Sequence, residues 1–293
     1  MTASPSSSHH ARGVWFMLLS AFSFTVTTLI IRALGAVQSV DVWLLTSLRF
    51  AVGLVVVGSF FRTGPDALQP RNLYRNRRLI FRGFGGAIGV YTYYLAVVHL
   101  GAGRATFINS TYFAMGAVLA VLVLRERLRP VLAAGGALTI IGLALITNAF
   151  GTGAGIGFYD VIAIISALSS AYVVVTIRQL HAEGEHTATI FSAQCVFGLM
   201  ICATPAAVNW APTAPLAWLL MILAGLGAAA GQLSMTRSFR DLPVGEGSLL
   251  QMLVPLGTAI GGAVFFHEHF LPHELIGAGL ILLGSALPAV RKT

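Results

Sequence analysis

Two stretches of the chain read as versions of one another. Residues 100–145 are LGAGRATFINSTYFAMGAVLAVLVLRERLRPVLAAGGALTIIGLAL and residues 242–287 are LPVGEGSLLQMLVPLGTAIGGAVFFHEHFLPHELIGAGLILLGSAL; they align without a gap at a constant offset of 142. The identical pairs include Glu126/Glu268, Pro130/Pro272, Gly135/Gly277 and Gly142/Gly284. Earlier in each half the offset becomes 146, and the identical pairs there include Ser20/Ser166, Ser23/Ser169 and Arg32/Arg178. The second half of the chain therefore repeats the first.

The composition is that of a membrane protein. Hydrophobic residues make up 56% of the 293 residues and charged residues only 10%, against roughly 25% charge in an average soluble domain. The net charge of +8 does not indicate nucleic-acid binding, because the basic residues lie between apolar segments instead of gathering on one face. A repeat within such an apolar chain is typical of duplicated transporters, whose substrate site lies between the copies.

The apolar segments predict an all-α integral membrane protein with ten transmembrane helices, since about 20 apolar residues cross a bilayer. The predicted spans are Val14–Leu34, Val42–Phe61, Leu79–Val98, Ala105–Leu124, Val131–Asn148, Phe158–Ile177, Ala188–Val208, Leu216–Met235, Gly247–Phe266 and His273–Val290. They divide into two five-helix repeats, residues 1–150 and 151–293, which together form one transport domain. The first span is longer than a signal-peptide core of ~7–15 residues and is expected to remain uncleaved.

The basic residues predict the topology. Most of the 18 Lys and Arg residues fall on one side of the predicted spans, and the positive-inside rule makes that side cytoplasmic. Both termini are then cytoplasmic, and we expect a multi-pass protein of the cell (inner) membrane. Because each repeat has an odd number of spans, the second repeat must be inverted relative to the first. Inverted repeats supply the two related conformations that alternating access requires.

Two short motifs resemble those of a known family. Leu124–Pro130 and its counterpart Phe266–Pro272 each contain a glutamate after a predicted span, and residues 48–50 read Leu-Arg-Phe. With the five-helix duplication, these segments resemble the drug/metabolite transporter superfamily in its ten-helix EamA-type branch. The chain differs in having Arg125 and His267 where the family usually has glycine before the glutamate. The resemblance implies a secondary transporter of small metabolites, and bacterial members are commonly metabolite or amino-acid exporters.

Polar residues in the middle of the spans are the candidates for a substrate site. Asn109 aligns with Gln251 under the 142 offset, so both amides are expected to face one cavity. An amide donates and accepts hydrogen bonds, which suits a zwitterionic ligand; the alternative is hydrogen bonding between helices. The other candidates are Tyr91, Tyr94, Tyr112, Tyr172, Gln232, Ser23 and Ser169, with helix packing as the alternative for the serines. We expect the first, third, fourth, sixth, eighth and ninth spans to line this cavity.

Two further residues have predicted roles. Arg49 is expected to be the only cation well inside a span, since Arg82 is counted with the cytoplasmic cations. A charge at that depth normally faces protein or water, so Arg49 either contacts an anionic group of the substrate or bonds backbone carbonyls as part of the scaffold. Pro255 lies four residues after Gln251 and is predicted to kink or gate its helix.

The energy source and substrate are inferred from what the spans contain. No Asp or Glu lies in the middle of a predicted span, which favours transport without proton coupling. A sugar phosphate would require two or more cations in the cavity. With Arg49 alone, a neutral, zwitterionic or partly apolar solute such as an amino acid fits better. We expect a protein that functions as a monomer in the lipid bilayer, binds a small-molecule substrate, and needs neither nucleic acid nor a cofactor.

Two alternatives remain open on the sequence. One is a proton-coupled drug/metabolite antiporter. The other is a membrane-embedded enzyme acting on a lipid or lipid-linked substrate, which would need a reactive cluster at one membrane face. The candidate residues for such a cluster are His267, Glu268, His269, His273 and Glu274. That loop lacks the H-E-x-x-H zinc motif, so no catalytic residue and no metal site is predicted there.

Overall fold

The computed structural model describes residues 7–64, 67–112, 115, 116, 119, 130–146, 156–242, 247 and 250–290, and this part of the chain consists of helices and their connections. The helices are α1 (Ser7–Val37), α2 (Val42–Phe60), α3 (Asn72–Arg75), α4 (Arg77–Leu100), α5 (Ala102–Ser110), α7 (Pro130–Ile146), α8 (Phe158–Ala182), α9 (Thr187–Val208), α10 (Pro215–Asp241), α12 (Leu253–Phe266) and α13 (Pro272–Val290).

Six of these helices, α1, α2, α4, α8, α9 and α10, are long and apolar enough to cross a membrane. Shorter apolar helices are Ala134–Ile146, Leu253–Phe266 and Pro272–Gly284. The positions of these nine segments correspond to nine of the predicted spans, and the expectation of an all-helical membrane protein is confirmed. The predicted span Ala105–Leu124 begins within α5 and continues largely outside the described residues. The predicted boundary between residues 150 and 151 also lies outside them.

Polar residues define where several helices begin. Asp41 accepts hydrogen bonds from the backbone nitrogens of Trp43 (2.7 Å) and Leu44 (3.1 Å), which satisfies two of the unpaired donors at the start of α2. Asn76 accepts from the backbone nitrogen of Arg78 (3.0 Å) at the start of α4. Gly101 separates α4 from α5 with φ +88°, a left-handed conformation that favours glycine.

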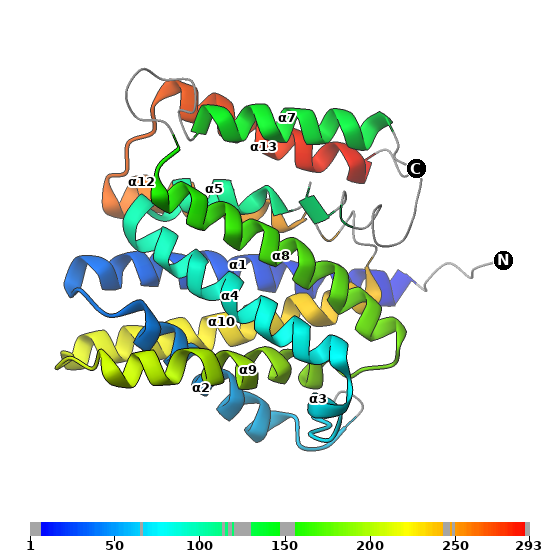
Figure 1. The fold of residues 1–293 in the computed structure, drawn as a ribbon. Coiled ribbons are helices and arrows are strands. Elements are labelled where there is room, and N and C mark those ends of the chain that lie inside the picture. The colour runs from blue at the N-terminus through cyan, green and yellow to red at the C-terminus, as the bar shows by residue number, and fades with distance from the viewer. Residues whose placement is uncertain are drawn as a thin grey trace.

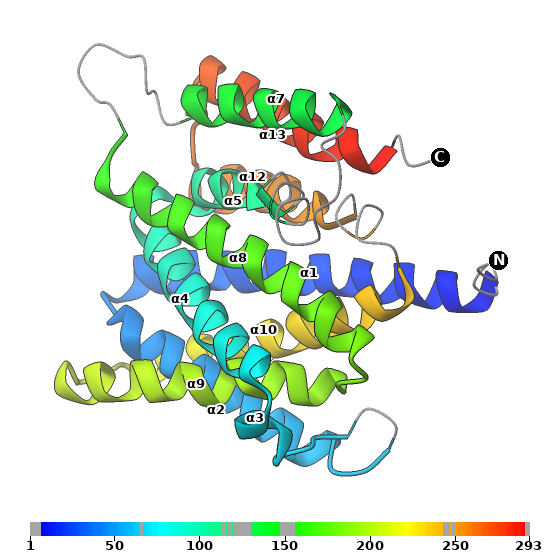
Figure 2. The same cartoon turned by 45° about the vertical axis from the view of Figure 1, so that its right-hand side comes forward.

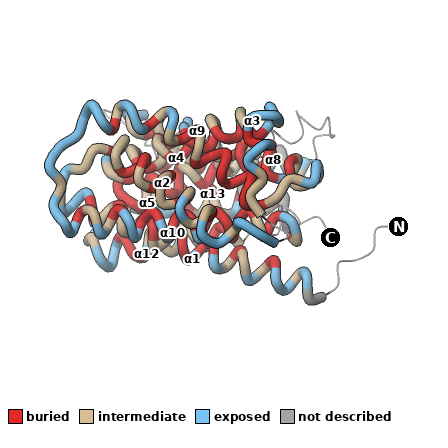
Figure 3. Tube along the Cα trace, turned by 90° about the horizontal axis from the view of Figure 1, so that it is seen from below, coloured by how far each residue is buried: buried red, intermediate tan, exposed pale blue. Residues whose placement is uncertain are grey.

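The surface of the helical body is largely apolar. Large side chains such as Phe22 (67% exposed), Val55 (67%) and Ile260 (65%) point outward from three different helices. The buried residues form a continuous interior, and exposed residues mark the periphery and the connections (Figure 3). In a soluble protein such a surface would aggregate, whereas acyl chains solvate it without cost.

α7 and α13 form a separate pair at one edge of the molecule and pack chiefly against each other (Figures 1 and 2). A Cβ atom built on Gly142 would lie 2.5 Å from the carbonyl oxygen of Gly277, and one built on Gly284 would lie 2.5 Å from that of Gly135. The two helices therefore touch through their backbones, as small residues at membrane helix crossings allow.

The remaining helices surround the interior in paired contacts. α1 packs along α10, and α4 packs along α8. α2 packs on α9 and α10, while α9 also contacts α4; α12 lies between α1 and α5, and α5 also contacts α8. The start of α1 and the end of α13 lie at the same end of the molecule, on the right in Figures 1 and 2.

A candidate substrate cavity

A cavity of about 130 Å³ lies between the helices. It is lined by Phe24, Thr27, Thr28, Arg49, Gly86, Gly89, Val90, Tyr93, Tyr94, Thr106, Asn109, Ser110, Tyr112, Ser170, Val173, Val174, Gln194, Gln232, Met235, Gln251, Val254 and Pro255. These residues come from α1, α2, α4, α5, α8, α9, α10 and α12 and from the segments next to α5 and α12. The first and second halves of the chain thus both contribute to its wall.

The structure brings seven of the predicted site residues to this cavity and leaves four outside it. Those that line it are Arg49, Tyr94, Asn109, Tyr112, Gln232, Gln251 and Pro255. Of the four others, Tyr91 stacks on Trp43 with 3.8 Å between ring centroids. Ser169 and Tyr172 pack against Gly89 and Gly85 of α4, and Ser23 is buried. For these four residues, packing accounts for their position.

Beside the cavity one helix ends and another begins, and each of these helix termini lies next to one of the paired amides. α5 ends at Ser110, directly after Asn109, and α12 begins at Leu253, two residues after Gln251. Pro255 has no N–H to donate to the Gln251 carbonyl one turn earlier, which explains the start of α12. Pro255 therefore lies in the first turn of its helix, whereas the sequence placed it in the interior of a longer one.

Each amide is anchored by a serine of a neighbouring helix. The single hydrogen of the Ser166 hydroxyl in α8 is shared between Asn109 Oδ1 (3.0 Å) and the carbonyl oxygen of Gly89 (2.9 Å). Gln251 Nε2 donates to the Ser20 hydroxyl of α1 (2.9 Å). One end of each amide is thus used for a bond between helices. Asn109 Nδ2 and Gln251 Oε1 have no partner among the described residues, so a donor and an acceptor remain for a ligand.

Arg49 reaches the cavity from α2 and is only 7% exposed. Its Nη1 donates to the Tyr94 hydroxyl (2.8 Å), and its guanidinium carbon lies 5.2 Å from the centre of the Tyr94 ring. The partner is a side chain instead of the backbone carbonyls that a purely scaffolding role predicted. Among the described residues, no carboxylate is close enough to Arg49 to form an ion pair.

The cavity-facing side of α4 differs from the predicted one. Gly86, Gly89, Val90 and Tyr93 line the cavity at helical spacing, whereas the prediction placed Tyr91 on that face. The Tyr93 hydroxyl lies 2.9 Å from Thr28 Oγ1 and 2.8 Å from Thr106 Oγ1, which links α1, α4 and α5. Gly86, Gly89 and Tyr93 are spaced three and four residues apart, as on one face of a helix, and this spacing was the signal that could have identified the cavity-facing side.

Arg82 and Gln194 are polar residues of the interior that the sequence did not single out. Arg82 is fully buried and lies within the candidate span Arg77–Leu100, so it is a second cation of the interior beside Arg49. Its Nη1 donates to Gln194 Oε1 (2.9 Å), and Gln194 Nε2 donates to the carbonyl oxygen of Gly86 (3.1 Å). Arg82 already lay within the predicted span Leu79–Val98, which was the available signal.

Glu268 holds the beginning of α5 from the connection between α12 and α13. It accepts hydrogen bonds from the backbone nitrogens of Ala102 (3.0 Å) and Gly103 (3.2 Å), and from Arg32 Nε (3.0 Å). A carboxylate at this position satisfies unpaired donors and is favoured by the helix dipole. Its repeat counterpart, Glu126, lies outside the described residues.

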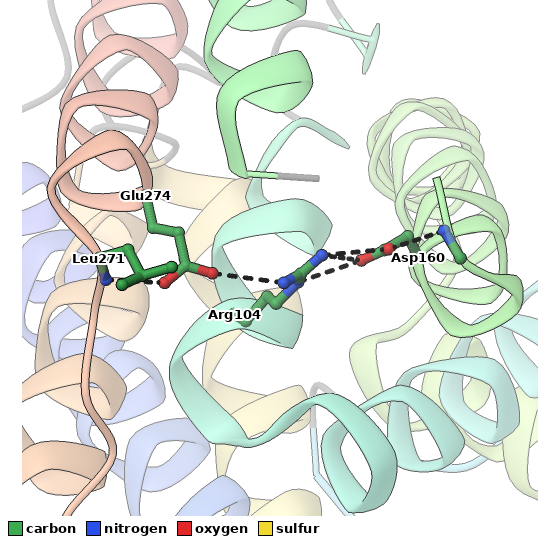
Figure 4. A network of polar contacts seen from close by, with 5 residues as sticks. Arg104, Asp160, Leu271 and Glu274 are labelled. Atoms are coloured by element: carbon green, nitrogen blue, oxygen red, sulfur yellow. Dashed lines mark hydrogen bonds and ion pairs between the residues drawn. The ribbon is translucent and has the colours of Figure 1, made fainter. Parts of the chain in front are cut away.

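A second ion-pair cluster lies at the same end of the molecule. Arg104 of α5 donates to both carboxylate oxygens of Asp160 in α8 (3.0 and 3.1 Å) and to Glu274 of α13 (3.3 Å), as Figure 4 shows. Glu274 also accepts from the backbone nitrogen of Leu271 (2.9 Å). We call Arg32, Arg104, Asp160, Glu268 and Glu274 the charged end. It ties together α1, α5, α8 and α13 beyond the cavity.

The comparisons with known proteins agree with this architecture. A solved crystal structure superposes on the chain with a TM-score of 0.62 and 18% sequence identity, over 96% of this chain and 97% of its own, which supports the fold. The "Pseudopaline exporter CntI" of Pseudomonas aeruginosa, in strains UCBPP-PA14 and PAO1, is 25% identical over 289 residues and 96% of each chain.

One family description matches the chain twice, over residues 11–148 and again over residues 157–289. These two matches cover nearly all of both halves. They agree with the repeat at offsets 142 and 146 and with the apolar helices that surround a polar cavity. The chain is a multi-pass membrane protein with a small-molecule substrate, and it belongs to the EamA-like transporter family of the drug/metabolite transporter superfamily.

Proposed function

We propose that this protein exports small metabolites, namely amino acids or similar zwitterionic, partly apolar solutes, by alternating access through the cavity. Residues 1–150 and 151–293 act as two inverted five-helix repeats of one transport domain, with both termini in the cytoplasm and the protein in the inner membrane. The direction of transport is supported by the exporter named among the relatives. All of the described cavity-lining residues come from one chain, which is compatible with a functional monomer.

The observation that carries the proposal is the matched pair of hydrogen bonds beside the cavity. Asn109 and Gln251 are repeat counterparts, and so are their partners Ser166 and Ser20. Each bond ties a helix end to a neighbouring helix on its own side of the cavity. Helix ends at the midplane, held at the interface between repeats, are the usual form of substrate sites in secondary transporters.

The helix contacts support the inverted arrangement. If α1 corresponds to α8, α2 to α9 and α4 to α10, the packing of α1 on α10 corresponds to that of α8 on α4. The packing of α4 on α9 likewise corresponds to that of α10 on α2. The crossing of α7 and α13 relates Gly142 and Gly277 as it relates Gly284 and Gly135. A twofold axis in the membrane plane accounts for all of these pairs.

The polar groups of the cavity suit an amino-acid-like solute. Asn109 Nδ2 is available as a donor and Gln251 Oε1 as an acceptor, while Phe24, Tyr93, Tyr94 and Tyr112 supply aromatic surface. Aromatic rings can hold an ammonium group by cation–π attraction. None of the described lining residues is Asp, Glu or His, which favours uncoupled transport over proton antiport.

Counterflow in proteoliposomes with a panel of labelled amino acids tests this function. We expect saturable exchange that a pH gradient does not change, and a decrease of about tenfold in Asn109→Ala and in Gln251→Ala, since each loses a hydrogen bond worth roughly 1–1.5 kcal/mol. Asn209→Ala removes an exposed amide at the end of α9 and should leave exchange unchanged. Uptake driven by the pH gradient would contradict uncoupled transport, and exchange of none of the amino acids would reject that substrate class.

A further inference from the structure

Two buried arginines in the interior have no counter-ion among the described residues. Arg82 is 0% exposed and Arg49 is 7% exposed. The arginines in the ion pairs of the described residues are Arg12, Arg32, Arg78, Arg104 and Arg237. A buried charge is energetically costly unless it is paired. Within a membrane protein, an unpaired buried charge typically marks a site that binds a ligand. The interior therefore carries two positive charges that nothing in the described part of the chain neutralises.

Arg82 lies directly behind the wall of the cavity. Its Nη1 bonds to Gln194, and its Nε and Nη2 have no hydrogen-bond partner among the described residues. Gln194 and Gly86 both line the cavity. A Cβ atom built on Gly86 would lie 2.9 Å from Gln194 Cδ and 3.1 Å from Arg82 Nη1. The bare backbone at Gly86 thus allows the guanidinium and the amide to approach the cavity closely.

Gln194 connects Arg82 to the cavity. Its Oε1 accepts from Arg82, and one hydrogen of its Nε2 goes to the Gly86 carbonyl, which leaves the second hydrogen for a ligand. A charged donor on the oxygen polarises the amide and strengthens its N–H groups, because hydrogen bonds in a chain reinforce one another. Arg82 therefore acts through Gln194 as a positioning residue for an anion.

Arg49 lies on α2, which packs against this part of α9. A Cβ atom built on Gly53, four residues after Arg49 on α2, would lie 2.8 Å from the Sγ of Cys195, the residue after Gln194. The potentials of the two guanidinium groups therefore add around this turn of α9, in an interior of low dielectric constant where such fields are weakly screened.

The rest of the wall also favours anions. Gln232 Nε2 is buried without a hydrogen-bond partner among the described residues, and Asn109 Nδ2 is available as well. No Asp or Glu occurs among the lining residues that the structure describes. Guanidinium and amide N–H groups together form the donor set that binds carboxylate and phosphate oxygens.

We propose that the cavity selects net-anionic metabolites, amino-acid-like compounds that carry an additional carboxylate or phosphate group, with Arg49 contacting the anionic group and Arg82 positioning it through Gln194. This inference rests on the proposed transport function and narrows its substrate class. It also revises the argument from a single cavity cation that favoured neutral solutes.

The first test compares matched probes in the wild-type protein and needs no substitution. L-glutamate and L-glutamine have nearly the same shape but differ in charge, and O-phospho-L-serine and L-serine differ by the phosphate. In proteoliposome counterflow we expect the KM for glutamate to be at least tenfold lower than that for glutamine, since a charged hydrogen-bonded group is gained. A preference for O-phospho-L-serine over glutamate would assign the site to phosphate esters, and a preference for glutamate would assign it to carboxylates.

The second test addresses Arg82. We expect Arg82→Met to raise the KM for the anionic probe about tenfold, to leave that for glutamine within twofold, and to change the maximal rate little. Arg82→Lys should restore much of the preference. Arg77→Met removes an exposed cation five residues earlier on α4 and is the matched control, expected to behave as wild type. This difference between the two probes is not expected from a purely structural role.

The outcomes separate the inference from the function on which it rests. Equal or better exchange of the neutral member of each pair by the wild-type protein overturns the anion preference and leaves transport standing. Equal loss of both probes in Arg82→Met, in protein that remains folded, assigns Arg82 to the scaffold and overturns its role. Absence of exchange for every amino acid in the panel, charged or neutral, overturns the proposed function and this inference with it.

Discussion

Glu268→Ala is expected to lower the free energy of unfolding by about 3 kcal/mol, because two groups lose their partners at once. The backbone nitrogens of Ala102 and Gly103 lose their acceptor at the start of α5, a loss of about 1 kcal/mol for a helix cap. Arg32 loses a carboxylate partner that is only 12% exposed, and breaking a buried ion pair costs about 3–5 kcal/mol. That range is reduced here since the Arg32 side chain is 32% exposed.

Thermal unfolding of the purified protein in detergent measures this effect. Glu268→Gln keeps an acceptor for the helix but loses the charge, so its midpoint should fall between those of wild type and Glu268→Ala. Glu183→Ala removes a carboxylate that pairs with Arg78 at the surface, where both side chains are over a third exposed. Such pairs contribute about 0–1 kcal/mol. If Glu268→Ala and Glu183→Ala had the same midpoint, Glu268 would not stabilise α5.

A second large effect is expected where α7 crosses α13. Gly142→Leu should cost about 3 kcal/mol, because any Cβ at this position would lie 2.5 Å from the Gly277 carbonyl oxygen and 2.9 Å from the Ile281 nitrogen. These are backbone atoms, so relief requires the helices to move apart. Overpacking in well-packed interiors costs about 1–3 kcal/mol. We expect the upper end of that range here, because separating the two helices removes their other packing contacts as well.

Gly136→Leu is the matched control on the same helix, since a Cβ at Gly136 would have no neighbour within 4 Å. We expect its unfolding midpoint to equal or exceed that of wild type, because leucine favours a helix over glycine by roughly 0.5–1 kcal/mol. The two midpoints are compared by thermal unfolding monitored by size-exclusion chromatography. Equal midpoints for the two leucine variants would show that the α7–α13 crossing tolerates separation.

The sequence predicted the helices well because the signal was physical and local. Segments of about 20 apolar residues have few alternatives to spanning a membrane. The offset of 142 also paired Asn109 with Gln251, both of which line the cavity. The repeat brought these amides together because equivalent positions of two related copies occupy similar places in the fold.

The rest of the candidate site required packing that the sequence does not record. Shifting the cavity-facing side of α4 by one residue replaces Tyr91 with Val90 and adds Tyr93 beside Tyr94, and hydropathy does not resolve that difference. Arg82 was assigned to the cytoplasm because it lies near the end of a span, although its helix is covered there by α9. The charged end joins Arg32 to Glu268 and Arg104 to Asp160, pairs so distant in sequence that only the fold brings them together.

The crossing of α7 and α13 also has an evolutionary consequence. Gly142 meets Gly277, and Gly284 meets Gly135. In the repeat, Gly142 corresponds to Gly284 and Gly135 corresponds to Gly277. Under the proposed inverted duplication, each of these contacts is the other one seen from the opposite copy, which makes the surface isologous. An ancestral five-helix chain inserted in both orientations would have formed the same crossing as a homodimer. Gene fusion then had to supply only a connecting segment, because each half already carried the surface that holds the pair together.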